Sequence, residues 1–145
     1  VGSEMCIRDS IYVGPQMIGD SLLVIMLGTN DVNHLSNLTT MAVEYLTFVN
    51  GYIAAGYKAQ NIIIVSPPYG ISGSGWDAGA FDANKLQTVR GIAATTAQTL
   101  GCKYVDGYAA TAAISGTTLQ ADGIHQSTAG HAALAKAILS GIYQA

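Results

Sequence analysis

Charge is scarce in this 145-residue sequence: Asp, Glu, Lys and Arg together make up 10% of the residues, and the formal net charge is −3. No stripe of Lys and Arg exists that could neutralise phosphate groups, so we do not expect nucleic acid as a partner. Half of the residues are apolar. A chain of this length and composition is sufficient for one compact domain with a hydrophobic core and too short for two.

Long apolar runs and cysteine clusters are missing as well. The apolar runs at 22–27 and 62–65 have the length of strands, so no transmembrane segment is expected. Cys6 and Cys102 can form at most one disulfide bond, and neither lies in a CxxC motif or a Cys/His cluster, so we expect neither a disulfide framework nor a metal site. Abundant small residues with little charge are typical of secreted proteins, but no signal peptide is visible, and the compartment stays open.

The first ten residues, "VGSEMCIRDS", have no clear hydrophobic period and no capping pattern. They resemble the peptide that results when a sequencing adapter is translated in frame. We therefore expect residues 1–10 to be a non-native leader and residues 11–145 to be a partial domain whose front has been lost.

From residue 21 onward, apolar runs of strand length alternate with segments whose apolar residues recur at helical spacing. We predict strands over 21–28, 61–66 and 103–106, helices over 37–57, 82–100 and 127–143, and an irregular stretch between the third strand and residue 123. This alternation predicts an α/β fold with a parallel sheet and helices on both faces, and the first strand should be buried on both faces. A flavodoxin-like sheet has five strands, so two are expected to be missing from the front.

Open α/β sheets place their functional sites at the carboxyl ends of the strands. Asn30 and Asp31 follow the first predicted strand, and Asp122 and His125 lie beyond the third, at the start of the last helix. A histidine can act as general base in acyl transfer when a carboxylate orients it, and an asparagine amide can donate to an oxyanion. Each pair also has a simpler interpretation, as a helix cap beside a surface histidine and as turn residues.

Three stretches carry a resemblance to a known family: "VIMLGTND" at 24–31, "NIIIVSPPYG" at 61–70 and "ADGIHQSTAGHAALAKAI" at 121–138. In order and spacing they are similar to motif blocks of the SGNH hydrolases, also called the GDSL esterase/lipase family, over about residues 20–143. The resemblance implies a three-layer α/β/α fold and hydrolysis of ester bonds through a serine nucleophile, without a metal or another cofactor. The substrate would be an ester of a small molecule, a glycan or a lipid.

The resemblance also implies a role for each matching residue. Asn30 is expected to be an oxyanion-hole donor, His125 the general base, and Asp122 the carboxylate that orients it. Gly28 and Asp31 are expected to shape the turn that presents Asn30.

The triplet Gly19-Asp20-Ser21 matches the family's older name but lies in the wrong place. Ser21 precedes the first predicted strand, whereas Asn30 follows it, and strand residues at about 3.3 Å each separate the two by roughly 20 Å. A nucleophile must lie within about 3 Å of its base. In the family, the nucleophile block also precedes the Asn30 block by a crossover and a further strand. We therefore interpret Ser21 as a decoy and expect the nucleophile to be absent.

His34, Tyr69 and Trp76 are candidates for lining the substrate, although each can also be a solvated loop residue or cover the rim of the core. Our hypothesis is a carboxyl-terminal part of a serine ester hydrolase that is inactive alone. The alternative is a non-catalytic module, for polysaccharide for example, on the same fold. A nucleotide-binding flavodoxin-like domain is disfavoured because no glycine-rich loop stands between a strand and a helix.

Overall fold

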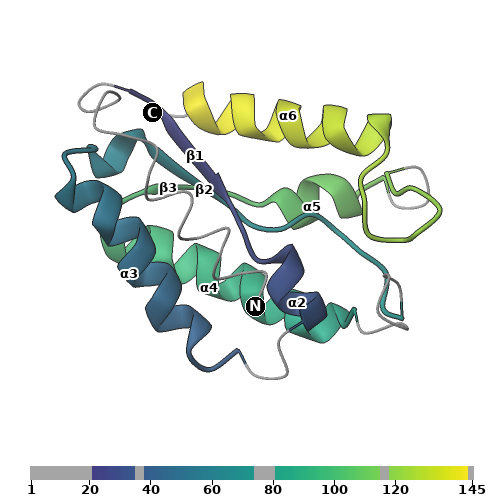
Figure 1. Ribbon diagram of the computed structural model, residues 1–145. Coiled ribbons are helices and arrows are strands. Elements are labelled where there is room, and N and C mark those ends of the chain that lie inside the picture. The colour runs from purple at the N-terminus through teal and green to yellow at the C-terminus, as the bar shows by residue number, and fades with distance from the viewer. Residues whose placement is uncertain (1–20, 35–37, 74–80, 115–117, 144–145) are drawn as a thin grey trace.

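Three parallel strands form the centre of the protein (Figure 1). The structure is a computed structural model, and it describes residues 21–34, 38–73, 81–114 and 118–143. The strands are β1 (Leu23–Met26), β2 (Ile62–Val65) and β3 (Lys103–Val105). Strand β2 lies between the other two, and both of its pairings are parallel. All three predicted strands are therefore present, each slightly shorter than predicted.

Helices cover both faces of this sheet. They are α2 (Thr29–His34), α3 (Met41–Ala54), α4 (Ala83–Leu100), α5 (Gly107–Ala112) and α6 (Thr128–Tyr143), with a short 3-10 turn, η2 (Ala59–Asn61), before β2. Figure 1 shows α6 on one face and α3 and α4 on the other. The predicted three-layer α/β/α arrangement is thus confirmed. Among the described residues, no helix is long and apolar enough to cross a membrane.

The side chains of β2 alternate between two apolar clusters. Ile62 and Ile64 belong to the larger cluster, with α3 and α4, whereas Ile63 and Val65 belong to a smaller one that includes Leu134 of α6. All four β2 side chains are fully buried. Burying an aliphatic side chain of this size stabilises the fold by about 1.5–3 kcal/mol. The apolar run at 62–65 is therefore a strand buried on both faces.

Strand β1 was also expected to be buried on both faces, but only one of its faces is covered. Ile25 is 5% exposed and packs in the larger cluster, but Leu22, Val24 and Met26 are 46%, 41% and 42% exposed. These three side chains alternate with the buried ones and so share the opposite face. The smaller cluster, under α6, contains no β1 residue. In the described part of the chain, β1 is thus an edge strand with one covered face.

Helix α4 ends where sequence signals place its ends. The side chain of Asp82 accepts a hydrogen bond from the backbone N–H of Asn84 at 2.8 Å, which caps the amino end. Gly101 has φ of +71°, the left-handed conformation that closes the carboxyl end.

Two short helices were not predicted. Helix α2 occupies what was expected to be a turn, and α5 lies in the stretch expected to be irregular. Each has six residues, too few to show an apolar stripe. Asp106 caps α5 by accepting a hydrogen bond from the backbone N–H of Ala109 at 3.0 Å, and this cap was the signal available in the sequence.

Candidate active site

Asp122 and His125 form a close pair on the loop that enters α6. Nδ1 of His125 lies 2.6 Å from Oδ2 of Asp122. The other carboxylate oxygen accepts the backbone N–H groups of Ile124 at 3.0 Å and His125 at 2.9 Å. The N–H of Ile124, followed by the side chain and N–H of His125, lowers the pKa of Asp122 to about 2. An ionised carboxylate only accepts, so Nδ1 carries the proton and Nε2 is the ring nitrogen able to take one.

The backbone of this loop closes on itself, which fixes the pair. The N–H of Gln120 donates to the carbonyl of His125 at 2.8 Å, and the N–H of Gly123 donates to the carbonyl of Gln120 at 3.0 Å. Gly123 has φ of +73°, a conformation that glycine adopts without strain. The side chains of His125 and Asp122 remain 46% and 43% exposed. A rigid loop therefore presents an accessible His–Asp pair.

The segment after β2 lies against this loop. The N–H of Ile71 donates to the carbonyl of Gly123 at 2.9 Å, and Tyr69 receives a hydrogen bond at its carbonyl from the side chain of Gln126, also at 2.9 Å. The ring of Tyr69 packs edge-on against Tyr108 of α5, with 5.7 Å between the ring centroids. Tyr69 thus borders the His–Asp loop through its backbone, and its substrate-lining role stays a prediction.

Asn30 lies in the first turn of α2, directly after β1. It is exposed, and the helix starts from Gly28, whose carbonyl accepts the N–H of Val32 at 3.1 Å. Gly28 has φ of +113°, and a Cβ atom there would lie 2.3 Å from Val89 and 3.3 Å from the Pro67 ring. Gly28 therefore packs beside the exit of β2. Asn30 directly follows β1, and the Asp122–His125 loop contacts Tyr69 and Ile71, which follow β2, so both lie at the carboxyl edge of the sheet.

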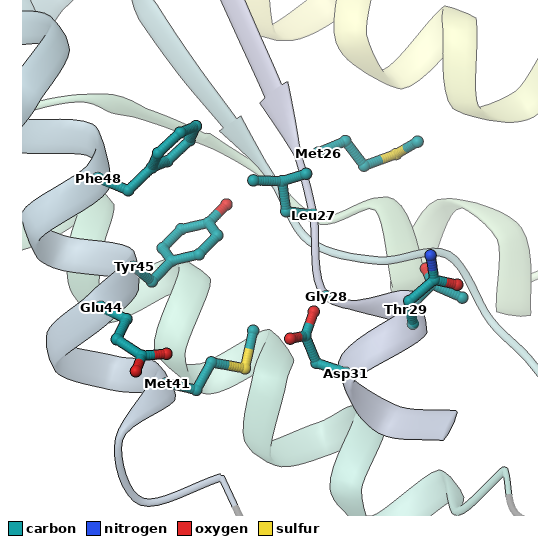
Figure 2. Close-up of a pocket in the computed structure, with 10 residues that line it drawn as sticks. Met26, Leu27, Gly28, Thr29, Asp31, Met41, Glu44, Tyr45 and Phe48 are labelled. Atoms are coloured by element: carbon teal, nitrogen blue, oxygen red, sulfur yellow. The ribbon is translucent and has the colours of Figure 1, made fainter. Parts of the chain in front are cut away.

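A cavity of about 170 Å³ opens beside Asn30, between the end of β1, α2 and α3 (Figure 2). Asp31 and Met41 face each other across it, and the hydroxyl of Tyr45 points toward Leu27. That hydroxyl has no hydrogen-bond partner among the described residues. Burial, with a smaller contribution from Asp31, raises the pKa of Tyr45 well above its ordinary value. Asp31 thus lines a cavity, which its expected role in a turn did not include.

A second polar cluster lies at the amino end of α5. Nε of Arg90 donates to Oδ1 of Asp106 at 3.0 Å, its Nη2 bonds Oδ2, and Ser66 donates to Oδ1 at 3.3 Å. Burial alone would raise the pKa of Asp106, but the hydrogen bonds from Arg90 and the N–H of Ala109 outweigh it, so the pKa of Asp106 is lowered. The guanidinium of Arg90 also lies 4.9 Å from the ring centre of Tyr108. Sequence reasoning missed this cluster, although Asp106 directly follows a predicted strand.

Three further residues were singled out from the sequence: His34, Trp76 and Ser21. The backbone of His34 ends α2, and Trp76 lies outside the described residues. Ser21 precedes β1, at the end opposite Gly28. Within the described ranges, no group of three or more His, Cys, Asp or Glu side chains could hold a metal ion.

Several solved structures are similar to this fold. Axe2, an acetylxylan esterase from Geobacillus stearothermophilus, is 25% identical with a TM-score of 0.68, and the match covers 98% of this chain and 67% of Axe2. A lipase/acylhydrolase from Enterococcus faecalis is also 25% identical, with a TM-score of 0.70, and the match covers 84% of this chain and 60% of that enzyme. The chain thus spans only about two thirds of these structures. Variants of Axe2 in which a serine, an aspartate or a histidine is replaced are described as catalytic mutants.

Sequence comparisons identify the family. No curated protein matches the chain at a significant level. The family model of the GDSL-like lipases and acylhydrolases, in contrast, matches residues 8–133, which is most of the chain. This match agrees with the α/β/α architecture and with the similar solved structures. The chain belongs to the GDSL-like lipase/acylhydrolase family.

Proposed function

We propose that the protein is the carboxyl-terminal part of a serine ester hydrolase in which His125 is the general base, Asp122 orients it and Asn30 donates to the oxyanion. The observation that carries this proposal is the 2.6 Å contact between Nδ1 of His125 and Oδ2 of Asp122. The aspartate and histidine of the Axe2 catalytic mutants are three positions apart, which is the spacing of Asp122 and His125. This agreement supports the assignment of the pair.

The nucleophile is the part of the site that we place outside this chain. Ser21 lies at the amino end of β1, whereas Asn30 follows the carboxyl end of β1 and the His125 loop contacts Tyr69 beyond the carboxyl end of β2. In Axe2 the serine of the catalytic mutant precedes the aspartate by more residues than this chain contains in all. Both observations favour a serine upstream of the present sequence and an inactive chain in isolation.

The steps of the reaction follow from these positions. The upstream serine attacks the ester carbonyl while Nε2 of His125 takes its proton, and Asp122 stabilises the imidazolium that forms. The amide of Asn30 donates to the oxyanion as negative charge develops. His125 then protonates the leaving alcohol, and water releases the acid from the acyl-enzyme by the same path.

The ester that such an enzyme hydrolyses can belong to a glycan, a lipid or a small molecule. We take acetylated glycans first because Axe2 is described as an acetylxylan esterase. The cavity of about 170 Å³ beside Asn30 is also smaller than the roughly 300–1,000 Å³ typical of sites for larger ligands. A short acyl group therefore fits the site best.

A chimaera tests this proposal. The amino-terminal third of Axe2, which includes its serine, is joined ahead of residue 21, and hydrolysis of p-nitrophenyl acetate and acetylated xylan is measured. We expect the chain alone to be inactive and the chimaera to be active. His125→Ala and Asp122→Ala should abolish activity, whereas Ser21→Ala and the exposed His131→Ala should leave it unchanged.

Two outcomes would count against the proposal. Activity of the chain alone that disappears in Ser21→Ala would show that the nucleophile is present and that Ser21 is no decoy. A folded chimaera without activity, together with binding of acetylated xylan by the chain alone, would favour a non-catalytic module.

A further inference from the structure

The residue directly after His125 makes an unusual contact for a surface loop. Gln126 is 5% exposed, and its Nε2 donates to the carbonyl of Tyr69 at 2.9 Å and to that of Ile124 at 3.4 Å. The first bond joins residues 57 positions apart in the chain. One side-chain amide therefore connects the segment after β2 to the turn that holds the His–Asp pair.

The surroundings leave little freedom to this amide. A Cβ atom on Gly130 would lie 2.5 Å from Oε1 of Gln126 and 2.4 Å from the carbonyl of Thr118, so α6 approaches this point closely only because it has a glycine there. The backbone carbonyl of Gln126 accepts the side-chain amide of Gln120 at 3.2 Å. Residue 126 is therefore held through both its backbone and its side chain.

The oxygen of the same amide is buried without a hydrogen-bond partner among the described residues. An unpaired buried oxygen is unfavourable, and an apolar side chain of similar length would avoid that cost. The hydrogen bonds made by Nε2 are thus the feature that distinguishes glutamine from methionine at this position.

We infer that Gln126 is a positioning residue, whose amide clamps the Asp122–His125 turn to the exit of β2 and thereby sets where the imidazole lies at the sheet edge. The hydrogen bond from Ile71 to Gly123 fixes the opposite side of the turn. Without the clamp, the His125 end of the turn loses its attachment to Tyr69, whereas the Gly123 end keeps its bond to Ile71. His125 can then move relative to Asp122, which loosens the contact between Nδ1 and the carboxylate. The catalytic meaning of this clamp rests on the proposed function, whereas the clamp itself does not.

Nitrogen-15 NMR of the imidazole tests this inference in the whole chain, without substrate. Spectra are recorded at about pH 8, above the ordinary range for histidine titration. The His125 signals are identified by their loss in His125→Gln. The unsubstituted chain should show one tautomer, with the proton on Nδ1. In Gln126→Met the two nitrogen shifts should move toward each other because both tautomers become populated, and Gln98→Met, the same change on the exposed face of α4, should have no effect.

Two further measurements keep the inference open to refutation. Gln126→Asn retains an amide that is too short to reach Tyr69, so it should act like Gln126→Met if the latter fails to fold. In the unsubstituted chain, the Gln126 amide protons should exchange with solvent far more slowly than those of Gln98. Folded variants with an unchanged His125 tautomer, or equal exchange rates for the two amides, would overturn the inference. A folded chimaera without activity would count against the proposed function and leave these results in place.

Discussion

Hydrogen bonds from its own loop lower the pKa of Asp122, so this carboxyl group is ionised without any substrate. The folded-state pKa of about 2 is below the ordinary value of 3.8, so the contribution of this carboxylate to stability is present above the ordinary value and is lost as the pH falls toward 2. We expect a titration midpoint near 2 in carbon-13 NMR of the Asp122 carboxyl. In His125→Ala the midpoint should rise but stay below the ordinary value, because the N–H of Ile124 is the largest cause of the shift. A midpoint near 4 in the unsubstituted chain would contradict this account.

Gly28 combines a positive φ with a close neighbour, so a single methyl group there should be costly. Its φ of +113° disfavours any side chain, and a Cβ atom would overlap Val89 at 2.3 Å. We expect Gly28→Ala to lower the free energy of unfolding by about 2–4 kcal/mol, measured by urea denaturation. Gly51→Ala is the matched control, because nothing lies within 4 Å of a Cβ there, and it should stabilise helix α3 by about 0.5–1 kcal/mol. Equal effects of the two changes would show that Gly28 is not confined.

At the scale of elements, two aspartates cap helices with different additional partners. Asp82 caps α4 and is bonded there to Asn84, whereas Asp106 caps α5 and also bonds Arg90 and Ser66. We expect Asp82→Ala to cost about 1 kcal/mol of unfolding free energy and Asp106→Ala about 2–3 kcal/mol, because the second change also removes the carboxylate that Arg90 bonds. Thermal and urea denaturation of both variants measure the difference. A smaller loss for Asp106→Ala would mean that the Arg90 contact adds nothing.

The length of an element decided whether it could be predicted. Helix α4 has 18 residues, a clear apolar face, an aspartate cap and a terminal glycine, so both ends were predicted within a residue. Helices α2 and α5 have six residues each, fewer than two turns, and no periodic pattern develops over that length. Their positions depend on tertiary contacts such as the packing of Gly28 beside Pro67.

The same limit applies to the candidate site. Asp122 and His125 are three residues apart, so this short spacing, together with the resemblance to the family's last motif block, was enough to predict that they lie together. The bond from Gln126 to Tyr69 spans 57 residues, and that from Arg90 to Asp106 spans 16, so neither follows from a local pattern. Tyr45 lies on the buried face of α3, and its hydroxyl beside the cavity became evident only in three dimensions.

At the scale of the whole molecule, the edge of β1 that no strand in the described ranges pairs with should control self-association. Leu22, Val24 and Met26 expose an apolar face, no charged residue lies between 22 and 27, and unpaired strand edges favour pairing between chains. We expect the chain to associate with rising concentration in analytical ultracentrifugation and Val24→Lys to reduce this association. Val43→Lys, at a 67% exposed site on α3, is the control and should have little effect. A strictly monomeric chain would contradict the prediction.

Strand β2 has a consequence for how the molecule opens. Its four side chains belong to two clusters on opposite faces, so neither cluster can come apart without disturbing the strand. The two cores should therefore unfold as one cooperative unit, and the amide hydrogens of β2 should exchange with deuterium only when the entire domain opens. Those near β1 and the Asp122–His125 loop should exchange through smaller local openings, leaving the centre of the sheet as the last part of the protein to retain its protons.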